Sequence, residues 1–293
     1  MMKILFTILF ISLFLSIHSN TLPQNQSKVD SLQTELTKTK NELKANEIAL
    51  STIRKDKQDL QTLAIIGGSI ATVLIAVIIF YQRRKSEQLL YTILPQKIAK
   101  RLKGTEDLIA DDYKNISIVF MDLVGFTAFA KEMPAAEVVK ILNEIFHRLD
   151  DLCTEHNLEK IKTMGDGYMA AAGVPEPDEK HAINIVNFAL AARDVIAELD
   201  KKSPMDLGAR LGIESGPVVA GVIGKQKFIY DLWGDSVNTA SRMESTGVPG
   251  KVQISENVKM EIEKRSDNYT FFKREPIEVK GRGVMQTYLV ELK

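Results

Sequence analysis

The strongest constraint on this chain is an uncharged apolar run at residues 63–81, LAIIGGSIATVLIAVIIFY. A helix needs about 20 such residues to cross the hydrocarbon core of a bilayer. Arg83, Arg84 and Lys85 follow at once, and basic residues beside a span favour the cytoplasmic side. A buried helix of a soluble protein would show polar positions on at least one side. The run therefore predicts a single transmembrane helix with the C-terminal part of the chain in the cytoplasm.

A second apolar segment, residues 4–17, follows Lys3 and precedes a stretch rich in serine and asparagine. It is short for a membrane span and is typical of a secretory signal peptide. We assign residues 1–19 to a signal peptide or to an N-terminal anchor that stays in place. The expected location is the plasma membrane, or the inner membrane of a bacterium.

Apolar residues recur at heptad spacing in the segment between these two runs. One seam position holds Val29, Leu36, Leu43 and Leu50, and the second holds Leu32, Ile53 and Leu60. This pattern predicts an extracytoplasmic coiled-coil stalk at residues 20–62 that favours dimers. Thr39, Asn46 and Lys57 interrupt the seam, so the pairing should be weak, and a solvated amphipathic helix is the alternative.

The pattern changes again after the basic cluster. Residues 82–111 have helical spacing of apolar residues, a break at Pro95 and a helix stop at Gly104, which predicts a linker helix. Residues 112–293 form one domain in which strands and helices mix, an α+β layer structure with helices covering a sheet. The expected strands are 116–120, 158–162, 168–172, 207–215 and 218–224, and the expected helices are 134–156, 178–199 and one beginning near 235.

The composition excludes some functions. The chain has 38 Lys and Arg against 38 Asp and Glu, so no net positive field draws it to nucleic acid, and we expect no nucleic-acid partner. Its single cysteine, Cys153, excludes an intramolecular disulfide and a cysteine-rich metal site.

Two aspartates stand where strands end. Asp122 follows the apolar strand ISIVFM, and Asp166 lies between two glycines at a hairpin tip. A carboxylate at the end of a buried strand is costly without a cation or hydrogen bonds. Two of them without a nearby His or Cys suit a hard ion such as Mg²⁺ or Mn²⁺. The alternative is a turn aspartate and a helix N-cap.

Two further segments carry residues suited to a phosphorylated ligand. In YDLWGDSVNTASRMES, residues 230–245, Asn238 and Arg242 share one helix face and could hold a sugar and a phosphate. Arg242 could equally pair with Glu244 or face solvent. In EVKGRG, residues 278–283, Lys280 could bind a polyphosphate, or the loop could be a solvated basic turn.

VFMDLVGFTAF, KIKTMGDGYMAA, YDLWGDSVNTASRMES and VKGRG, in this order, resemble the catalytic domain of class III adenylyl and guanylyl cyclases. The similarity runs from about Ile109 to the C-terminus, and LLYTILPQKIAKRL resembles the helix that precedes the domain in membrane-anchored bacterial-type adenylate cyclases. The resemblance implies a ferredoxin-like βαββαβ fold at residues 112–293. It also implies a head-to-tail homodimer with active sites at the interface.

The resemblance assigns roles by position. Two Mg²⁺ ions per site, which Mn²⁺ can replace, would bind Asp122 and Asp166. Lys162 and Asp231 would read the base. Asn238 and Arg242 would contact the ribose and the transition state, and Lys280 would contact the terminal phosphates. In such dimers the metals and the base are held by opposite subunits, so Lys162 and Asp166 on one hairpin would serve two different sites.

The pair at the base position favours ATP. A Lys donor and an Asp acceptor fit N1 and the 6-amino group of adenine, whereas guanylyl cyclases of this family typically place Glu and Cys there. The expected reaction converts ATP to 3′,5′-cyclic AMP and pyrophosphate for intracellular signalling. The alternatives are a guanylate or dual-specificity cyclase, a non-catalytic nucleotide-sensing or dimerising module, and a membrane scaffold held by its coiled coil. The sequence does not identify a stimulus or an upstream sensor partner.

Overall fold

The computed structural model describes residues 9–11, 13, 26–104, 108–202, 207–224, 228–279 and 283–293. Contacts divide the chain into two compact units, Met1–Lys85 and Ser86–Lys293. Most of the expected signal peptide or anchor at residues 1–19, and Lys280, lie outside the described residues.

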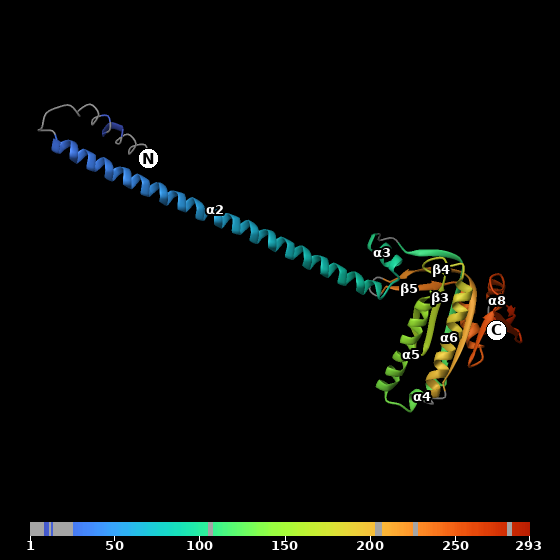
Figure 1. The fold of residues 1–293 in the computed structure, drawn as a ribbon. Coiled ribbons are helices and arrows are strands. Elements are labelled where there is room, and N and C mark those ends of the chain that lie inside the picture. Colours follow the sequence, from blue (N-terminus) through green and yellow to red (C-terminus); the bar gives the residue numbers. More distant parts are fainter. Residues whose placement is uncertain are drawn as a thin grey trace. The chain divides into compact units, whose positions relative to one another are not determined.

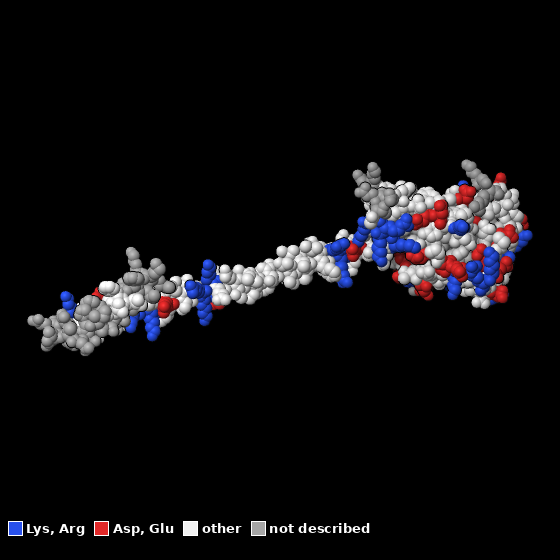
Figure 2. All heavy atoms as spheres, turned by 90° about the horizontal axis from the view of Figure 1, so that it is seen from above, with Lys and Arg blue, Asp and Glu red and all other residues white. Residues whose placement is uncertain are grey.

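The helix α2, Gln26–Tyr91, runs without interruption through residues 26–62 of the expected stalk, the apolar run and the start of the expected linker. Pro23 and Pro95 are the nearest prolines on either side, which accounts for the continuity, since proline inside a helix removes a hydrogen bond and clashes with the preceding turn. Figure 2 shows the uncharged middle of this helix, residues 60–82, between charged ends. Within the described part of the chain, α2 alone has the length and composition to cross a membrane.

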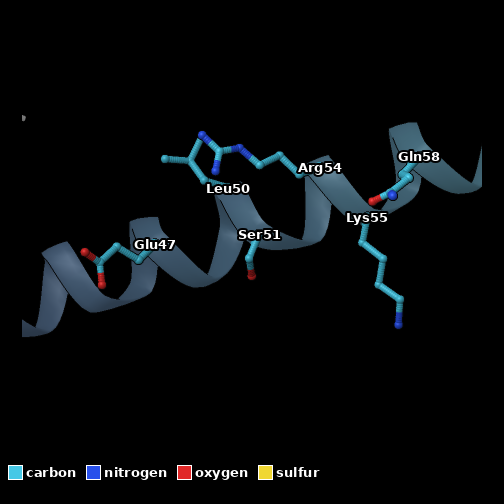
Figure 3. Close-up of a pocket in the computed structure, with 6 residues that line it drawn as sticks. All are labelled: Glu47, Leu50, Ser51, Arg54, Lys55 and Gln58. Atoms are coloured by element: carbon cyan, nitrogen blue, oxygen red, sulfur yellow. The ribbon is translucent and has the colours of Figure 1, made fainter.

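A shallow hollow on α2 does not form an enclosed site. It is bordered by Glu47, Leu50, Ser51, Arg54, Lys55 and Gln58. All of these come from one helix and are exposed, and Figure 3 shows Leu50 and Arg54 on the side opposite Ser51 and Lys55. This surface therefore lacks the convergent polar groups of a ligand pocket.

The unit Ser86–Lys293 is built on a βαββαβ core (Figure 1). Its elements are β1 (Ala110–Val124), α5 (Ala135–Glu155), β2 (Glu159–Met164), β3 (Gly167–Ala172), α6 (His181–Lys202) and β4 (Gly208–Ile223). The strands lie in the order β2-β3-β1-β4, and every neighbouring pair is antiparallel. This order is that of a ferredoxin-like sheet, as expected.

The remaining elements extend this core. They are α3 (Gln96–Gly104), α4 (Phe126–Lys131), β5 (Ile229–Trp233), α7 (Asp235–Ser245), β6 (Lys251–Ser255), α8 (Glu256–Glu263), β7 (Tyr269–Lys273), β8 (Ile277–Val279), β9 (Gly283–Met285) and β10 (Thr287–Leu292). β6 joins β4 in parallel and is followed across the sheet by β10 and β7, while β5 pairs with the C-terminal half of β4. β8 and β9 form a separate hairpin.

Both faces of the sheet are buried around β1, and the side chains of β1 alternate between the two cores. Val119, Met121 and Leu123 face a core that α5, α6 and α8 complete. Ile116 and Ile118 face a second core, to which α3 contributes Ile98 and α7 contributes Ala240. Because side chains of a strand alternate between faces, this segment reads as a nearly continuous apolar run.

The expected break between strands 207–215 and 218–224 is wrong, because β4 continues through both. Gly216 pairs with Ile116 and Val218 pairs with Tyr113, so a β1 bulge lies opposite Pro217. Proline has no N–H to give to a ladder and is tolerated at such an irregularity. The bulge on the partner strand, which is remote in sequence, therefore allows the proline.

Gly212→Ala should lower the free energy of unfolding by about 3 kcal/mol or more. The added methyl group would overlap backbone atoms, which cannot move aside as the end of a flexible side chain can. A Cβ at Gly212 would lie 1.9 Å from the backbone nitrogen of Glu244 in α7. Gly208→Ala on the same strand is the control, since its Cβ would meet Pro249 at an ordinary 3.5 Å. Denaturant unfolding of the full chain in detergent would measure both, and an equal cost for the two would refute the packing argument.

Buried His181 should make stability depend on pH. Ser117 Oγ lies 2.7 Å from Nδ1 of His181 and 2.6 Å from Ser215 Oγ. Burial is the largest influence on His181 and lowers its pKa. Among the nearby charged groups, Glu261 and Asp178 raise this pKa, and Arg265 and Lys264 lower it. The unfolded state therefore binds a proton more readily. Stability is present above the unfolded pKa of about 6.5 and is lost as pH falls below it.

Between pH 7 and pH 5, we expect the free energy of unfolding to fall less in His181→Asn than in wild type. Denaturant unfolding at several pH values would measure this. His147→Asn, at an exposed position on α5, should retain the loss seen in wild type. An unchanged pH dependence in His181→Asn would contradict the assignment.

Candidate active site

The two strand-end aspartates are brought together. Asp122 lies near the end of β1, and Asp166 lies in the turn between β2 and β3 after Gly165, whose φ of 65° is left-handed. A Cβ at Gly167 would lie 3.2 Å from Met164 O and 3.9 Å from Asp122 Oδ1. The turn can therefore lie close against β1 because a glycine follows Asp166.

The charges of these aspartates act on each other. Burial and then the neighbouring Asp166 raise the pKa of Asp122, and Arg210 opposes them. Two partly buried carboxylates that repel each other would be stabilised by a divalent cation. Among the described residues, no group of three or more His, Cys, Asp or Glu could hold a metal ion. The two carboxylate side chains suit a hard ion, whose remaining ligands would be water, backbone or substrate oxygens.

Lys162 and Asp231 form a second charged pair. Lys162 Nζ on β2 donates to Asp231 Oδ2 on β5 at 2.5 Å, and Leu232 N donates to the other oxygen of Asp231 at 2.8 Å. Their side chains are 35% and 16% exposed, so both can still reach a ligand. A strong donor and a strong acceptor are thus held side by side by strands remote in sequence.

The helix α7 presents Asn238 and Arg242 on its exposed side. Ser236 Oγ donates to Pro217 O at 2.9 Å and fixes the start of this helix on β4. Glu244 does not pair with Arg242, because it is buried and accepts a 2.6 Å hydrogen bond from Arg210 Nε. The alternative ion pair considered from the sequence is therefore wrong.

The sequence analysis missed Arg210, a charged residue near the aspartates, and considered Glu244 only as a partner of Arg242. Arg210 Nη2 lies 3.3 Å from Asp122 Oδ2. The available signal was an arginine within the otherwise apolar strand LGARLGI, where an unpaired charge would be costly. The identity of its partners could not be read from spacing, because they lie on β1 and on the last turn of α7.

Comparisons with known proteins agree with this architecture. Residues 108–292 match the family model of the adenylate and guanylate cyclase catalytic domain. An adenylate cyclase of Mycobacterium tuberculosis is 41% identical over 238 residues, which are 78% of this chain and 53% of that protein. The human guanylate cyclase soluble subunit beta-2 is 38% identical over 212 residues, 71% of this chain and 34% of that protein. The chain thus spans about half or less of the length of these relatives.

A solved structure gives the same result. The catalytic core of a rhodopsin-guanylyl cyclase with converted specificity, in complex with ATPαS, superposes with a TM-score of 0.57 at 34% identity and covers 63% of this chain and 98% of that one. The same family is indicated by the sequence motifs, by the βαββαβ core and by these matches. The chain belongs to the family of class III adenylyl and guanylyl cyclases.

Proposed function

We propose that this chain is an adenylate cyclase that converts ATP to 3′,5′-cyclic AMP and pyrophosphate for intracellular signalling. The single observation that carries the choice of ATP is the Lys162–Asp231 pair at 2.5 Å. Adenine offers an acceptor at N1 and a donor at its 6-amino group, which matches an ammonium beside a carboxylate. Guanine presents the reverse, and a wrong base would leave charged groups without partners, at a cost of about 1–3 kcal/mol or more.

GTP is the second candidate substrate. The chain is 38% identical to part of the human guanylate cyclase soluble subunit beta-2, and the family contains enzymes for both bases. The adenylate cyclase of M. tuberculosis is 41% identical. Both relatives support a cyclase, whereas the Lys162–Asp231 pair favours ATP.

Asp122 and Asp166 would hold two Mg²⁺ ions, or Mn²⁺ in their place. When bound, such ions lower the pKa of the ribose 3′-hydroxyl and neutralise charge on the α-phosphate, so no protein side chain need act as the base. Asn238 would position the ribose. Arg242 would stabilise charge that develops on the α-phosphate, because a guanidinium binds phosphate oxygens in a two-pronged manner. Lys280, outside the described residues, would bind the terminal phosphates.

A homodimer would complete each site, with the metals and the base held by opposite subunits. An apolar surface on β4, β5 and the residue before β5 supports this proposal, with Val219, Ile223, Phe228, Ile229 and Trp233 each at least 37% exposed. A two-fold dimer pairs the same patch on both subunits. The heptad positions Leu50, Ile53 and Leu60 on α2 are also exposed, which supports a coiled coil between two copies.

The chain would be a single-pass protein of the plasma or inner membrane. Residues 63–81 would cross the bilayer and Arg83, Arg84 and Lys85 would remain on the cytoplasmic side. Residues 20–62 would form the external stalk and residues 112–293 the cytoplasmic catalytic domain, joined by the linker at 82–111. Residues 1–19 would be a signal peptide or a second anchor.

The direct test incubates the purified full chain in detergent with ATP or GTP and with Mg²⁺ or Mn²⁺, and identifies the products by mass. We expect cyclic AMP, and a loss of roughly 100-fold or more in Asp122→Asn and Asp166→Asn. Asp151→Asn, an exposed aspartate on α5, should retain wild-type activity. A dominant cyclic GMP product would establish the second candidate, and no cyclic product from either nucleotide would refute a cyclase.

Sites shared between subunits should allow complementation. In the proposed dimer, Asp122 and Arg242 of one site would come from opposite subunits. Asp122→Ala and Arg242→Ala chains, each inactive alone, should then regain about a quarter of wild-type activity when co-expressed, because half of the dimers are mixed and each mixed dimer contains one intact site out of two. Co-expressed Asp122→Ala and Asp166→Ala chains are the control, since both changes affect the same half of a site and every site keeps a defect. Equal activity in the two mixtures would contradict the shared site.

A further inference from the structure

Arg210 contacts two carboxylates, Glu244 and Asp122, which differ in their distance from the guanidinium and in their exposure to solvent. Its Nε donates to Glu244 Oε1 at 2.6 Å and its Nη2 to Asp122 Oδ2 at 3.3 Å. The side chain of Glu244 is 11% exposed and that of Asp122 is 37% exposed. The shorter, more buried contact with Glu244 therefore holds the guanidinium, and the contact with Asp122 is the looser of the two.

The backbone around this contact is tightly packed. Asp122 and Arg210 are direct cross-strand partners in the β1–β4 ladder. A Cβ at Gly212 would lie 1.9 Å from Glu244 N, and a Cβ at Gly247 would lie 2.9 Å from Cγ of Arg210. The strand, the end of α7 and the stem of the arginine are thus fixed, so only the guanidinium can change partners without rearrangement of the fold.

A cation at the aspartates would compete with Arg210. The guanidinium and a divalent ion would both use oxygens of Asp122, and like charges a few ångströms apart repel each other. Glu244 reduces this repulsion because its buried carboxylate shares the charge of Arg210. The Oε1 atom of Glu244 accepts a hydrogen bond from Arg210 Nε, and among the described residues no group of three His, Cys, Asp or Glu is placed to hold an ion.

We propose that Arg210 is a resident counter-cation of Asp122, and that Glu244 is a positioning residue which draws Arg210 away and so sets the affinity of the aspartates for a divalent ion. The proposal rests on the metal site of the proposed function and extends it with two residues outside the ligand pair. Through Glu244, the metal affinity depends on α7, the same helix that carries Asn238 and Arg242.

If Glu244 and Arg210 set the metal affinity, substitutions of the two residues should change the affinity for Mn²⁺ in opposite directions, which a purely structural role would not do. Glu244→Gln removes the competing anion, so Arg210 should pair more fully with Asp122 and weaken Mn²⁺ binding, by roughly fivefold. Arg210→Gln removes the competing cation and should strengthen Mn²⁺ binding. The double variant restores the net charge of wild type and should return toward wild-type affinity. A residue needed only for packing would weaken binding in both single variants.

The experiment measures Mn²⁺ binding to the nucleotide-free full chain in detergent, from the electron paramagnetic resonance signal of free Mn²⁺. Asp122→Asn identifies the binding that belongs to the aspartates. Glu291→Gln is the matched control, because Glu291 accepts a 2.6 Å hydrogen bond from Arg193 in a similar arginine–carboxylate pair between β10 and α6. Glu244→Asp keeps the charge and should fall between wild type and Glu244→Gln, and thermal unfolding without metal checks that each variant is folded.

Weaker binding in Glu244→Gln, tighter binding in Arg210→Gln and an unchanged Glu291→Gln would support the proposal. Changes of the same sign in both single variants, or an unchanged Glu244→Gln, would overturn it while leaving the cyclase in place. If wild type shows no binding that Asp122→Asn removes, the metal site and this proposal both fail. If the binding pattern holds but no cyclic nucleotide is formed, only the proposed function fails.

Discussion

The long antiparallel pairing of β1 with β4 positions most of the charged side chains of the candidate site in the unit Ser86–Lys293. It joins the first and last strands of the βαββαβ core and sets Asp122 directly opposite Arg210. β3, with the Asp166 turn before it, pairs with the other edge of β1, and β5, which carries Asp231, pairs with the far half of β4. A shift of one residue in this ladder would turn the side chains of one strand to the opposite face. The charged groups therefore depend on one register.

The same pairing explains how charge is tolerated close to two apolar cores. Residues of β1 alternate between the core under α5 and α6 and the core under α3 and α7, and polar side chains occur where the strand ends or where a partner is available. Glu244 and Arg210 satisfy each other at 2.6 Å, and Ser117 satisfies His181. Burial of these groups is acceptable because each has a hydrogen-bond partner.

The apolar periods and the turn residues predicted an α+β layer structure, whereas the ferredoxin-like βαββαβ order was implied by the resemblance to class III cyclases. Sequence reasoning placed the break at Pro95 and the beginning of α7 near Asp235, both seen in the structure. It failed at Pro217, where a bulge on a remote strand permits a proline in a continuous β4. It also missed Arg210 and the pairing of Glu244 with Arg210, because a contact between β4 and α7 leaves no spacing signal in the chain. Local patterns predict elements, whereas long-range partners require the three-dimensional structure.

The unbroken α2 restricts how a chain of this kind can change in length. A helix turns by about 100° per residue, so one inserted or deleted residue rotates everything beyond it out of phase with the heptad seam, whereas seven residues nearly restore the phase. No proline or loop between Gln26 and Tyr91 can absorb such an error. Evolution of this segment should therefore favour gains and losses in whole heptads.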